Sequence, residues 1–599
     1  MARTRVPVLI VGGGAAGLTT SILLSRLGVE TLLVERHATT SMLPKAHILN
    51  QRTMEVFREA GLAAAVYEQG APLEDMSRTV WYTSLAGPTP LHGREVGRID
   101  SWGGGAQTAA YDAASPCRLT NLPQHWLEPL MLEHARRSSA AELLFRHELV
   151  GVVQDADGVT ATIRALDTGE EFEVTADHLV AADGGRTVGR LVGLELEGRR
   201  SLVNMVSTHF SADLSASLPD PGAAIYRFVN PDGPGLVHRG TLVQMGGGGW
   251  GRDCREWIFS FSVRPDDPTE FQADDIVANL RTMLGLPDQD IEVHRVSPWK
   301  VEGVAASKYR IGRICFVGDA AHRHPPAGGL GLNTAVQDAH NLAWKLAAVV
   351  RGRAGEGLLD SYESERRPIG VANAEHALGS FFQNQEVDRA LGFEPTTTPE
   401  ESWAVLATYF SDSPESAVLH ERVEAAIRSK RYAYQAHGQE LGFAYGEGAL
   451  VPDPSPAPEN PGDPVCDYVP STRPGHRVPH AWLHGGGEPI STVDLPRGEY
   501  FVVLTSPAGA DAWREAGVRA RAEFPEVPFG VVVVGPEGDL QDDGTWSRLR
   551  EVGEDGAILV RPDGHVAWRS HSGPSDPGVL ADVLGSVLFR APAPVRQVG

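Results

Sequence analysis

A glycine-rich turn near the start of the chain has the spacing of a dinucleotide-binding motif. Gly12, Gly14 and Gly17 follow a short apolar run and open a helical pattern. They predict a tight strand-to-helix turn whose backbone can approach a pyrophosphate at the positive helix N-terminus. Glu35 ends the next β-rich run, 18 residues after Gly17, where a carboxylate can accept hydrogen bonds from a ribose diol. The same contact region should include Ala16 and Arg36.

A second glycine run has similar spacing but the wrong context. Gly246, Gly248 and Gly251 are followed by Arg252, Asp253 and Cys254, which do not begin a helical pattern. We interpret this run as a loop. An enzyme that held two dinucleotides on separate Rossmann units should show two complete fingerprints. Any nicotinamide nucleotide must therefore bind without a Rossmann unit of its own.

A third motif carries a resemblance to a known enzyme family. It resembles the second FAD-binding motif of the p-hydroxybenzoate hydroxylase-like flavin monooxygenases, in the segment Gly318-Asp319-Ala320-Ala321-His322-x-x-x-Pro326-x-x-Gly329-x-Gly331-x-Asn333. Upstream, Asp183-Gly184 with Arg186 resembles the internal Asp-Gly motif of these enzymes. Leu122-Pro123-Gln124 resembles the segment whose glutamine approaches the flavin. The motifs follow one another in the order found in the family.

The resemblance implies FAD as the cofactor, and the residue types suit it. Asp319 can accept hydrogen bonds from a ribityl chain, and Pro325 and Pro326 can wall a flat ring. A helix that starts near Asn333 would stabilise negative charge on a reduced flavin. The implied cofactor contacts are Gln124, Asp183, Asp319, Pro326, Gly329, Gly331, Leu332 and Asn333.

His47 is the candidate catalytic residue. In the phenol hydroxylase branch of this family an aspartate at the matching position acts as a base toward the substrate hydroxyl, and the 2,4-dichlorophenol hydroxylase-like branch is similar to this chain in having histidine. A histidine with a pKa of about 6.5 can accept a phenolic proton or hydrogen-bond a phenolate. Base, hydrogen-bond partner and purely structural residue all stay open. We expect Arg52, in the same segment, to hold the FAD pyrophosphate or a nearby acid.

The activity that the resemblance implies is that of a single-component aromatic hydroxylase. NAD(P)H would reduce FAD, O2 would form a C4a-hydroperoxyflavin, and a phenol or hydroxylated heteroaromatic ring would accept oxygen in a dry pocket. Such a reaction serves secondary metabolism or aromatic degradation. Weaker candidates for the substrate pocket are Trp250, Trp257 and Trp299. The alternatives are a flavin halogenase, although a Trp-x-Trp-x-Ile-Pro stretch is absent, and an FAD-binding regulatory or scaffolding protein.

Composition limits the partners. A formal net charge of -24 argues against a nucleic-acid-binding surface, which needs clustered Lys and Arg. The 4 cysteines form no CxxC pair and favour a reducing cytoplasm. Apolar runs are too short to span a bilayer. His322-x-His324 lacks a third ligand at a recognisable spacing, so we predict no metal site. Assembly into a homo-oligomer is left open.

The elements that must position these residues predict an α/β chain of several domains. We expect a Rossmann-like FAD-binding domain at 1–192 and 298–400, with an inserted β-sheet substrate domain at 193–297. A helical segment and a proline-rich linker occupy 401–464. Residues 465–599 resemble the thioredoxin-like C-terminal domain of the phenol hydroxylase subgroup, beginning near Pro474-Gly475-x-Arg477-x-Pro479-His480. Because this domain lacks CxxC, its expected role is packing or subunit contact.

Overall fold

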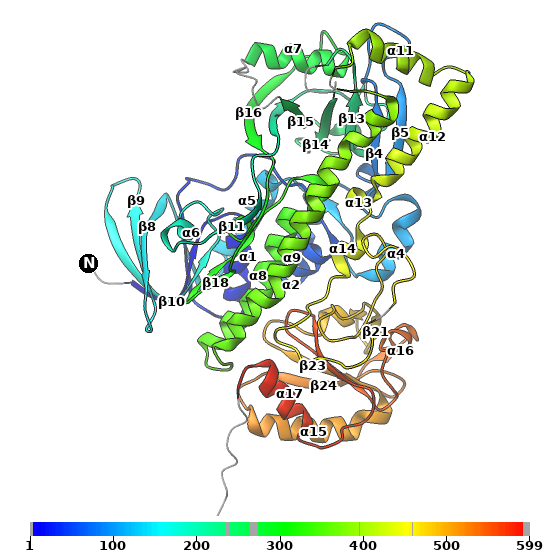
Figure 1. Cartoon of the computed structure of the whole chain (residues 1–599). Coiled ribbons are helices and arrows are strands. Elements are labelled where there is room, and N and C mark those ends of the chain that lie inside the picture. The colour runs from blue at the N-terminus through cyan, green and yellow to red at the C-terminus, as the bar shows by residue number, and fades with distance from the viewer. Residues whose placement is uncertain (1–3, 234–238, 264–272, 395, 458, 591–599) are drawn as a thin grey trace, which may run out of the picture.

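The computed structural model describes residues 4–233, 239–263, 273–394, 396–457 and 459–590. Three units follow one another along the molecule, with a Rossmann-like unit between a sheet unit and a smaller α/β unit (Figure 1). The expected α/β fold is confirmed. Among the described helices, none is both long and apolar enough to cross a membrane.

The central unit is a parallel sheet that starts with the first glycine turn. Its parallel strands lie in the order β7, β2, β1, β10 and β19, and the short β18 pairs antiparallel at the edge. Strands covered on both faces are apolar throughout, and Val8, Leu9 and Ile10 are fully buried. The bounds are β1 (Thr4–Val11), β2 (Thr31–Glu35), β7 (Ala141–Phe145), β10 (Glu171–Ala181), β18 (Arg310–Ile311) and β19 (Ile314–Phe316).

The helices of the central unit place both glycine motifs near one another. α1 (Ala15–Arg26) packs against α8 (Leu330–Val350), and α8 packs against both α2 (Gln51–Ala60) and α9 (Gly357–Phe382). α8 is buried along almost its whole length, so it forms the axis of the central unit. α9 extends from this unit toward the seven-stranded sheet (Figure 1).

The second unit is a seven-stranded sheet in the order β16, β12, β15, β14, β13, β4 and β5. The bounds are β4 (Arg78–Tyr82), β5 (Glu95–Asp100), β12 (Asn204–Ser211), β13 (Ala223–Val229), β14 (Arg239–Gln244), β15 (Glu256–Val263) and β16 (Glu292–Lys300). The expected domain boundary at 192 needs a correction, because β4 and β5 come from the segment assigned to the FAD-binding domain. β4 pairs with β13 far along the chain, and local patterns do not reveal such pairings.

Different helices cover the two faces of this sheet. α7 (Ala273–Leu284) covers one face, where Trp257 and Phe259 lie in the core. The core on the other face includes residues of α10 (Glu386–Leu391), α11 (Pro399–Tyr409) and α12 (Pro414–Ser429). Residues alternate between faces along a strand, so the side chain of Ile258 packs on the second face.

The C-terminal unit has the strand order β24, β23, β26 and β27. β23 and β24 are parallel and the other pairs are antiparallel, which confirms the expected thioredoxin-like arrangement. The bounds are β23 (Phe501–Thr505), α15 (Ala510–Glu523), β24 (Phe529–Val533), β26 (Ala557–Val560), β27 (Val566–Ser570) and α17 (Val579–Val587). The described part of the proline-rich linker contains neither helix nor strand.

Candidate active site

The first glycine turn has the geometry of a phosphate cradle. α1 begins at Ala15, with Gly14 as its N-cap. Gly12 has a φ of +111°, and a Cβ there would lie 2.2 Å from the carbonyl oxygen of Ala182. A Cβ on Gly17 would lie 1.9 Å from the carbonyl oxygen of Gly12. Only glycine fits at these two positions, which lets the backbone reach the N-terminus of α1 without obstruction.

Glu35 lies against this turn at the end of β2. Its Oε2 accepts a hydrogen bond from the backbone N–H of Gly13 at 2.7 Å, and its Oε1 accepts one from the backbone N–H of His37 at 2.7 Å. The carboxylate therefore occupies the edge of the glycine turn, where we expected the ribose diol. Arg36 follows at the same edge.

The second glycine motif is in contact with the first. A Cβ on Gly318 would lie 3.0 Å from the Cβ of Ala16, so α1 and the second motif pack closely. Asp319 follows in a short 3-10 helix and is exposed, as is Pro326 further along the loop. An exposed carboxylate in this position can accept hydrogen bonds from a ribityl chain.

α8 starts with a row of backbone donors. Gly328 and Gly329 have φ values of 82° and 65°, and the helix begins at Leu330. The first N–H groups of an α-helix have no partner within the helix, so the backbone of Gly331 and Leu332 offers donors at its positive end. Negative charge on a reduced flavin would be stabilised there. The glycine turn before α1 and the backbone donors at the start of α8 together fit FAD.

The side chain of Asn333 is held by groups of the chain itself, and its expected contact with the cofactor stays a prediction. Its amide nitrogen donates to the carbonyl oxygens of Ile48 at 2.9 Å and Gly329 at 2.6 Å, and its oxygen accepts from the N–H of Asn50 at 3.0 Å. Asn333 is 1% exposed, so its amide is committed to these contacts. It joins the start of α8 to the segment that carries His47.

Gln124 and Asp183 also bind partners within the chain. Gln124 Nε2 donates to Glu128 Oε1 at 2.6 Å. The Asp183 carboxylate accepts from the backbone N–H groups of Thr187 at 2.6 Å and Val188 at 2.8 Å. In this structure both side chains therefore shape the loops around the glycine motifs.

Glu128 was not among the expected residues, yet it lies at the N-terminus of α1. It belongs to α5 (Gln124–Arg136), and its Oε1 accepts from the N–H of Ala15 at 3.0 Å while its Oε2 accepts from that of Ser41 at 2.7 Å. Burial raises the pKa of Glu128, although the hydrogen bonds from Gln124, Ser41 and Ala15 oppose this shift. The only signal in the sequence was the Gln124-x-x-x-Glu128 spacing on one helix face.

His47 lies in a short antiparallel pairing beside Gln124. Its carbonyl oxygen accepts from the N–H of Leu122, and that of Ala46 accepts from the N–H of Gln124, both at 2.8 Å. The His47 Nδ1 lies 3.2 Å from Asn121 Oδ1. An amide oxygen only accepts, so Nδ1 carries the hydrogen and Nε2 of the neutral ring is the acceptor. Burial lowers the pKa of His47 to about 4, although the Asn121 hydrogen bond opposes this shift.

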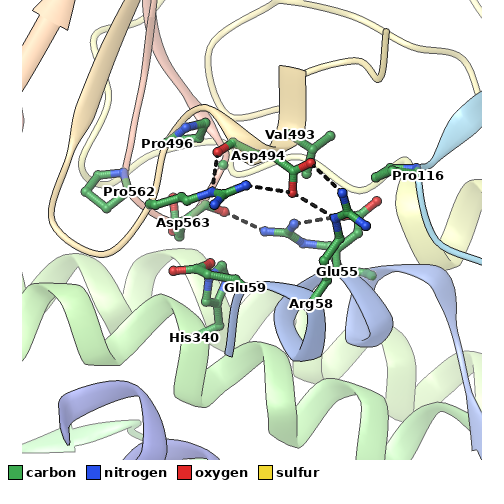
Figure 2. A pocket seen from close by; sticks show the side chains of 13 residues that line it. Glu55, Arg58, Glu59, Pro116, His340, Val493, Asp494, Pro496, Pro562 and Asp563 are labelled. Atoms are coloured by element: carbon green, nitrogen blue, oxygen red, sulfur yellow. Dashed lines mark hydrogen bonds and ion pairs between the residues drawn. The ribbon is translucent and has the colours of Figure 1, made fainter. Parts of the chain in front are cut away.

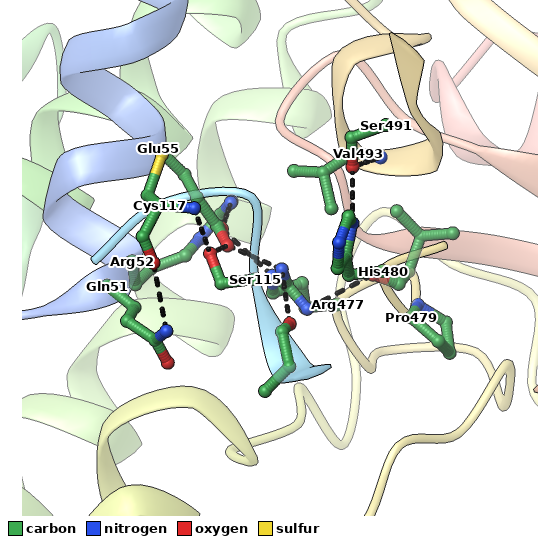
Figure 3. Close-up of polar contacts among 12 residues, drawn as sticks. Gln51, Arg52, Glu55, Ser115, Cys117, Arg477, Pro479, His480, Ser491 and Val493 are labelled. Atoms are coloured by element: carbon green, nitrogen blue, oxygen red, sulfur yellow. Dashed lines mark hydrogen bonds and ion pairs between the residues drawn. The ribbon is translucent and has the colours of Figure 1, made fainter. Parts of the chain in front are cut away.

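The contacts of Arg52 correct its assignment to the cofactor. We expected either the FAD pyrophosphate or a nearby acid, and the structure contains the acid. Arg52 Nη1 lies 2.9 Å from Glu55 Oε2, and Nη2 donates to the carbonyl oxygen of Asp563. Arg477 and Ser115 also bind Glu55 (Figure 3). Because the Arg52 side chain is 4% exposed, we withdraw its cofactor role.

A second group of buried charges joins α8 and α9 to the C-terminal unit. Glu365 accepts from Lys345 at 2.7 Å and from Arg561 at 2.7 and 2.8 Å, and Asp563 pairs with Arg561. Burial acts to raise the pKa of Glu365, but Arg561 and Lys345 outweigh it and lower the pKa to about 2. We call both groups the interface network, which consists of Arg52, Glu55, Lys345, Glu365, Arg477, Arg561 and Asp563.

A small pocket lies beside the interface network, between α2, α8 and the C-terminal unit (Figure 2). Within it Arg58 binds Asp494 through two hydrogen bonds of 3.0 Å, and His340 lies 2.8 Å from Glu59. Its lining includes neither His47 nor the glycine turns. We assign this pocket to the domain interface and not to the active site.

The three tryptophans have different surroundings. Trp257 is fully buried in the core under α7, and its Nε1 donates to the carbonyl oxygen of Ala212, so it does not line a substrate pocket. Trp250 donates to the carbonyl oxygen of Gln69, and Trp299 donates to Ser207 Oγ at 2.9 Å. Trp250 and Trp299 keep some exposure, and a role in lining the substrate pocket stays a prediction for them.

Known proteins resemble the chain over nearly its full length. Residues 5–377 match the FAD binding domain family, and residues 471–591 match the C-terminal domain of aromatic-ring hydroxylases. The chain is 38% identical to a 2,4-dichlorophenol 6-monooxygenase of Delftia acidovorans, over 94% of both chains. It is 36% identical to a phenol 2-monooxygenase of a Pseudomonas strain, over 98% of this chain and 94% of the relative.

A solved structure agrees with these matches. The flavin-dependent monooxygenase PieE, determined in complex with FAD and substrate, superimposes with a TM-score of 0.92 at 40% identity. The superposition covers 98% of this chain and 100% of that one. The likeness therefore includes all three units.

Proposed function

The chain belongs to the FAD-dependent aromatic-ring hydroxylases, and from this premise we propose that it hydroxylates a phenol whose hydroxyl group binds His47. FAD is the cofactor and NAD(P)H the transient reductant. Bound FAD supplies the transfer of electrons to O2 and of one oxygen atom to the ring. The printed names of two relatives, a dichlorophenol and a phenol monooxygenase, support a phenol as the substrate class.

One observation carries the proposal for His47. Its Nδ1 faces the buried Asn121, which leaves Nε2 as a hydrogen-bond acceptor. With a pKa of about 4, the ring is neutral at physiological pH and can accept a hydrogen bond from a phenolic hydroxyl. Neutral His47 therefore orients the substrate hydroxyl.

The lowered pKa also decides when the proton moves. A phenol with a pKa near 10 lies about 6 units above His47, so transfer before the reaction would cost roughly 8 kcal/mol. As oxygen bonds to the ring carbon, positive charge develops on the substrate hydroxyl and its proton becomes strongly acidic. The proton then moves to His47 Nε2 during the step, which is general base catalysis. His47 is thus a base in the transition state and a hydrogen-bond partner before it.

The distribution of cysteines supports a location in a reducing cytoplasm. All 4 cysteines are free, and three of them are buried. A thiol content without disulfides is typical of intracellular proteins.

His47→Ala tests this function. We expect FAD retention and substrate-independent NAD(P)H oxidation to persist, while hydroxylation falls by about 10²-fold or more. The defect should shrink as pH approaches the pKa of the phenol, because phenolate then forms without a base. The measurement is product per NAD(P)H consumed across pH, with phenols of different pKa.

The alternatives make different predictions for the same variant. A structural role for His47 predicts loss of FAD together with loss of activity. Normal hydroxylation by His47→Ala across the pH range would refute the proposal. His571→Ala is a suitable control, because that histidine is exposed in the C-terminal unit and has no place in the proposed step.

A further inference from the structure

Two imidazoles and a carboxylate meet where the central unit faces the seven-stranded sheet. His125 lies in the first turn of α5, His209 in β12, and Glu256 at the start of β15. Glu256 Oε2 lies 3.0 Å from His125 Nε2 and 3.2 Å from His209 Nε2. The three atoms that could bind a metal lie within 4.8 Å of one another. The site therefore draws on three distant chain segments.

The sheet register explains why two of these residues share a face. His209 pairs with Ile258 across the antiparallel β12 and β15 strands. Glu256 precedes Ile258 by two residues, so it points to the same side of the sheet as His209. α5 brings His125 to that side. The side chains of His125, His209 and Glu256 are 11%, 10% and 19% exposed, which leaves room for water to complete a coordination shell.

We propose that His125, His209 and Glu256 bind a divalent transition-metal ion, with Zn²⁺ as the best match. Two histidines and one glutamate form a known zinc donor set, with bonds of about 2.0–2.2 Å. In a tetrahedral shell, bonds of that length place ligand atoms about 3.3–3.5 Å apart. The observed 3.0 and 3.2 Å are close to this spacing, so small side-chain shifts admit the ion.

The contacts of the two histidines with Glu256 show which hydrogens must move when a metal ion binds. A histidine that ligates through Nε2 must carry its hydrogen on Nδ1. The hydrogens that now lie between each Nε2 and Glu256 therefore move to Nδ1 or leave to solvent. His125 Nδ1 is buried and has no hydrogen-bond partner among the described residues. A ligand without such support binds its metal about 10- to 100-fold more weakly, so we expect moderate affinity.

The position of the site gives it a structural consequence. α5 begins with Gln124, and the short pairing that holds His47 lies directly before it. A metal ion bound here would join this part of the central unit to the sheet with three coordinate bonds. It would do so without using His47 or the glycine turns.

Zinc titration of the FAD-loaded protein tests the proposal. We expect isothermal titration calorimetry to detect one Zn²⁺ per chain, and equilibrium dialysis followed by elemental analysis to give the same ratio. Glu256→Gln keeps the size of the side chain but removes its charge, and His125→Gln removes a ligand at the helix. Each variant should weaken zinc binding by about tenfold or more.

His294→Gln is the matched control. The ring of His294 lies 4.8 Å from that of His209 and is tilted by 57° against it, but its Nε2 lies 2.6 Å from Ser211 Oγ. This variant should bind zinc as the parent protein does. Flavin absorbance and circular dichroism check folding, and His209→Gln replaces any variant that fails to fold. Absence of saturable zinc binding, or equal binding by the parent and all ligand variants, would overturn the proposal.

Discussion

The two ends of the segment from His47 through α2 use polar groups in opposite ways. At the C-terminal unit, Glu55 is surrounded by Arg52, Arg477 and Ser115. At the His47 end, the amide nitrogen of buried Asn121 has no hydrogen-bond partner among the described residues. A buried polar group without a partner is costly. The contrast teaches that paired charges hold the units together, whereas the buried amide beside the proposed substrate-binding histidine still has a donor to offer.

The largest effect should follow from breaking the interface network. Glu365→Ala leaves the buried charges of Lys345 and Arg561 without their common partner, and we expect a loss of about 3–5 kcal/mol in the free energy of unfolding. Glu133→Ala is the control, because its pair with Arg137 is exposed and such pairs contribute about 0–1 kcal/mol. Denaturant titration followed by circular dichroism measures both. Equal destabilisation by the two variants would contradict a structural role for the network.

Glu35→Ala should weaken FAD binding and leave the fold intact. A hydrogen bond to a charged group contributes about 1.5–3 kcal/mol, and the residue is at a strand end where its loss opens no core cavity. Fluorescence titration of the apoprotein with FAD gives the dissociation constant. Glu30→Ala removes an exposed carboxylate just before the same strand and should leave FAD affinity unchanged. A protein that holds FMN in place of FAD would undermine the assignment of Glu35.

Substitutions of Asn121 should change the rate of hydroxylation and its dependence on pH. Asn121→Leu removes the acceptor of the His47 hydrogen, and hydroxylation should fall by roughly fivefold, as expected for about 1 kcal/mol. Asn121→Asp places an anion beside His47, which favours the protonated ring and raises its pKa from about 4. Because the proposed function needs neutral His47, we expect rates to be retained above this pKa and lost below it. The acid limb of the hydroxylation profile should therefore move to higher pH. If the acid limb of the Asn121→Asp profile stays at the same pH while the FAD content is full, the contact between Asn121 and His47 does not set the pKa of His47.

The smallest effect is expected at Cys466. Burial raises the pKa of its thiol to about 11, so little thiolate exists at neutral pH. Cys466→Ser should leave turnover and folding unchanged, as measured by steady-state kinetics and circular dichroism. Loss of activity in a folded variant would reveal thiol chemistry at the start of the C-terminal domain.

Local patterns predicted the parts of the molecule that depend on local geometry. The spacing of Gly12, Gly14 and Gly17 predicted the turn that the structure contains. The strand pattern after the linker predicted an α/β unit, and the family resemblance implied that it is thioredoxin-like. Arg52 was expected to hold the FAD pyrophosphate or a nearby acid, and Asn333 was expected at the cofactor because it ends the motif that carries the resemblance. Their side chains bind Asp563 and Ile48, and tertiary contacts of that kind leave no periodic signal.

The substrate side was harder to predict for the same reason. Strand alternation puts Trp257 and Phe259 on a common face, but which face turns toward the FAD-binding domain depends on how the units pack. Local patterns also fail to predict the proposed metal site, since His125, His209 and Glu256 come from separate elements. Their proximity appears only when α5 and the sheet are assembled.

The amide of Asn333 has a further consequence for how such enzymes diversify. Because it fastens the segment that carries His47 directly to the start of α8, the proposed proton acceptor and the proposed cofactor-binding helix form one attached unit. The seven-stranded sheet lies outside this attachment. Exchange of strands or loops in the sheet could therefore change which aromatic ring is admitted while the reacting hydroxyl stays in register with the cofactor. In a chimera with the sheet of a relative, substrate choice would follow the sheet and the pH dependence would follow the central unit.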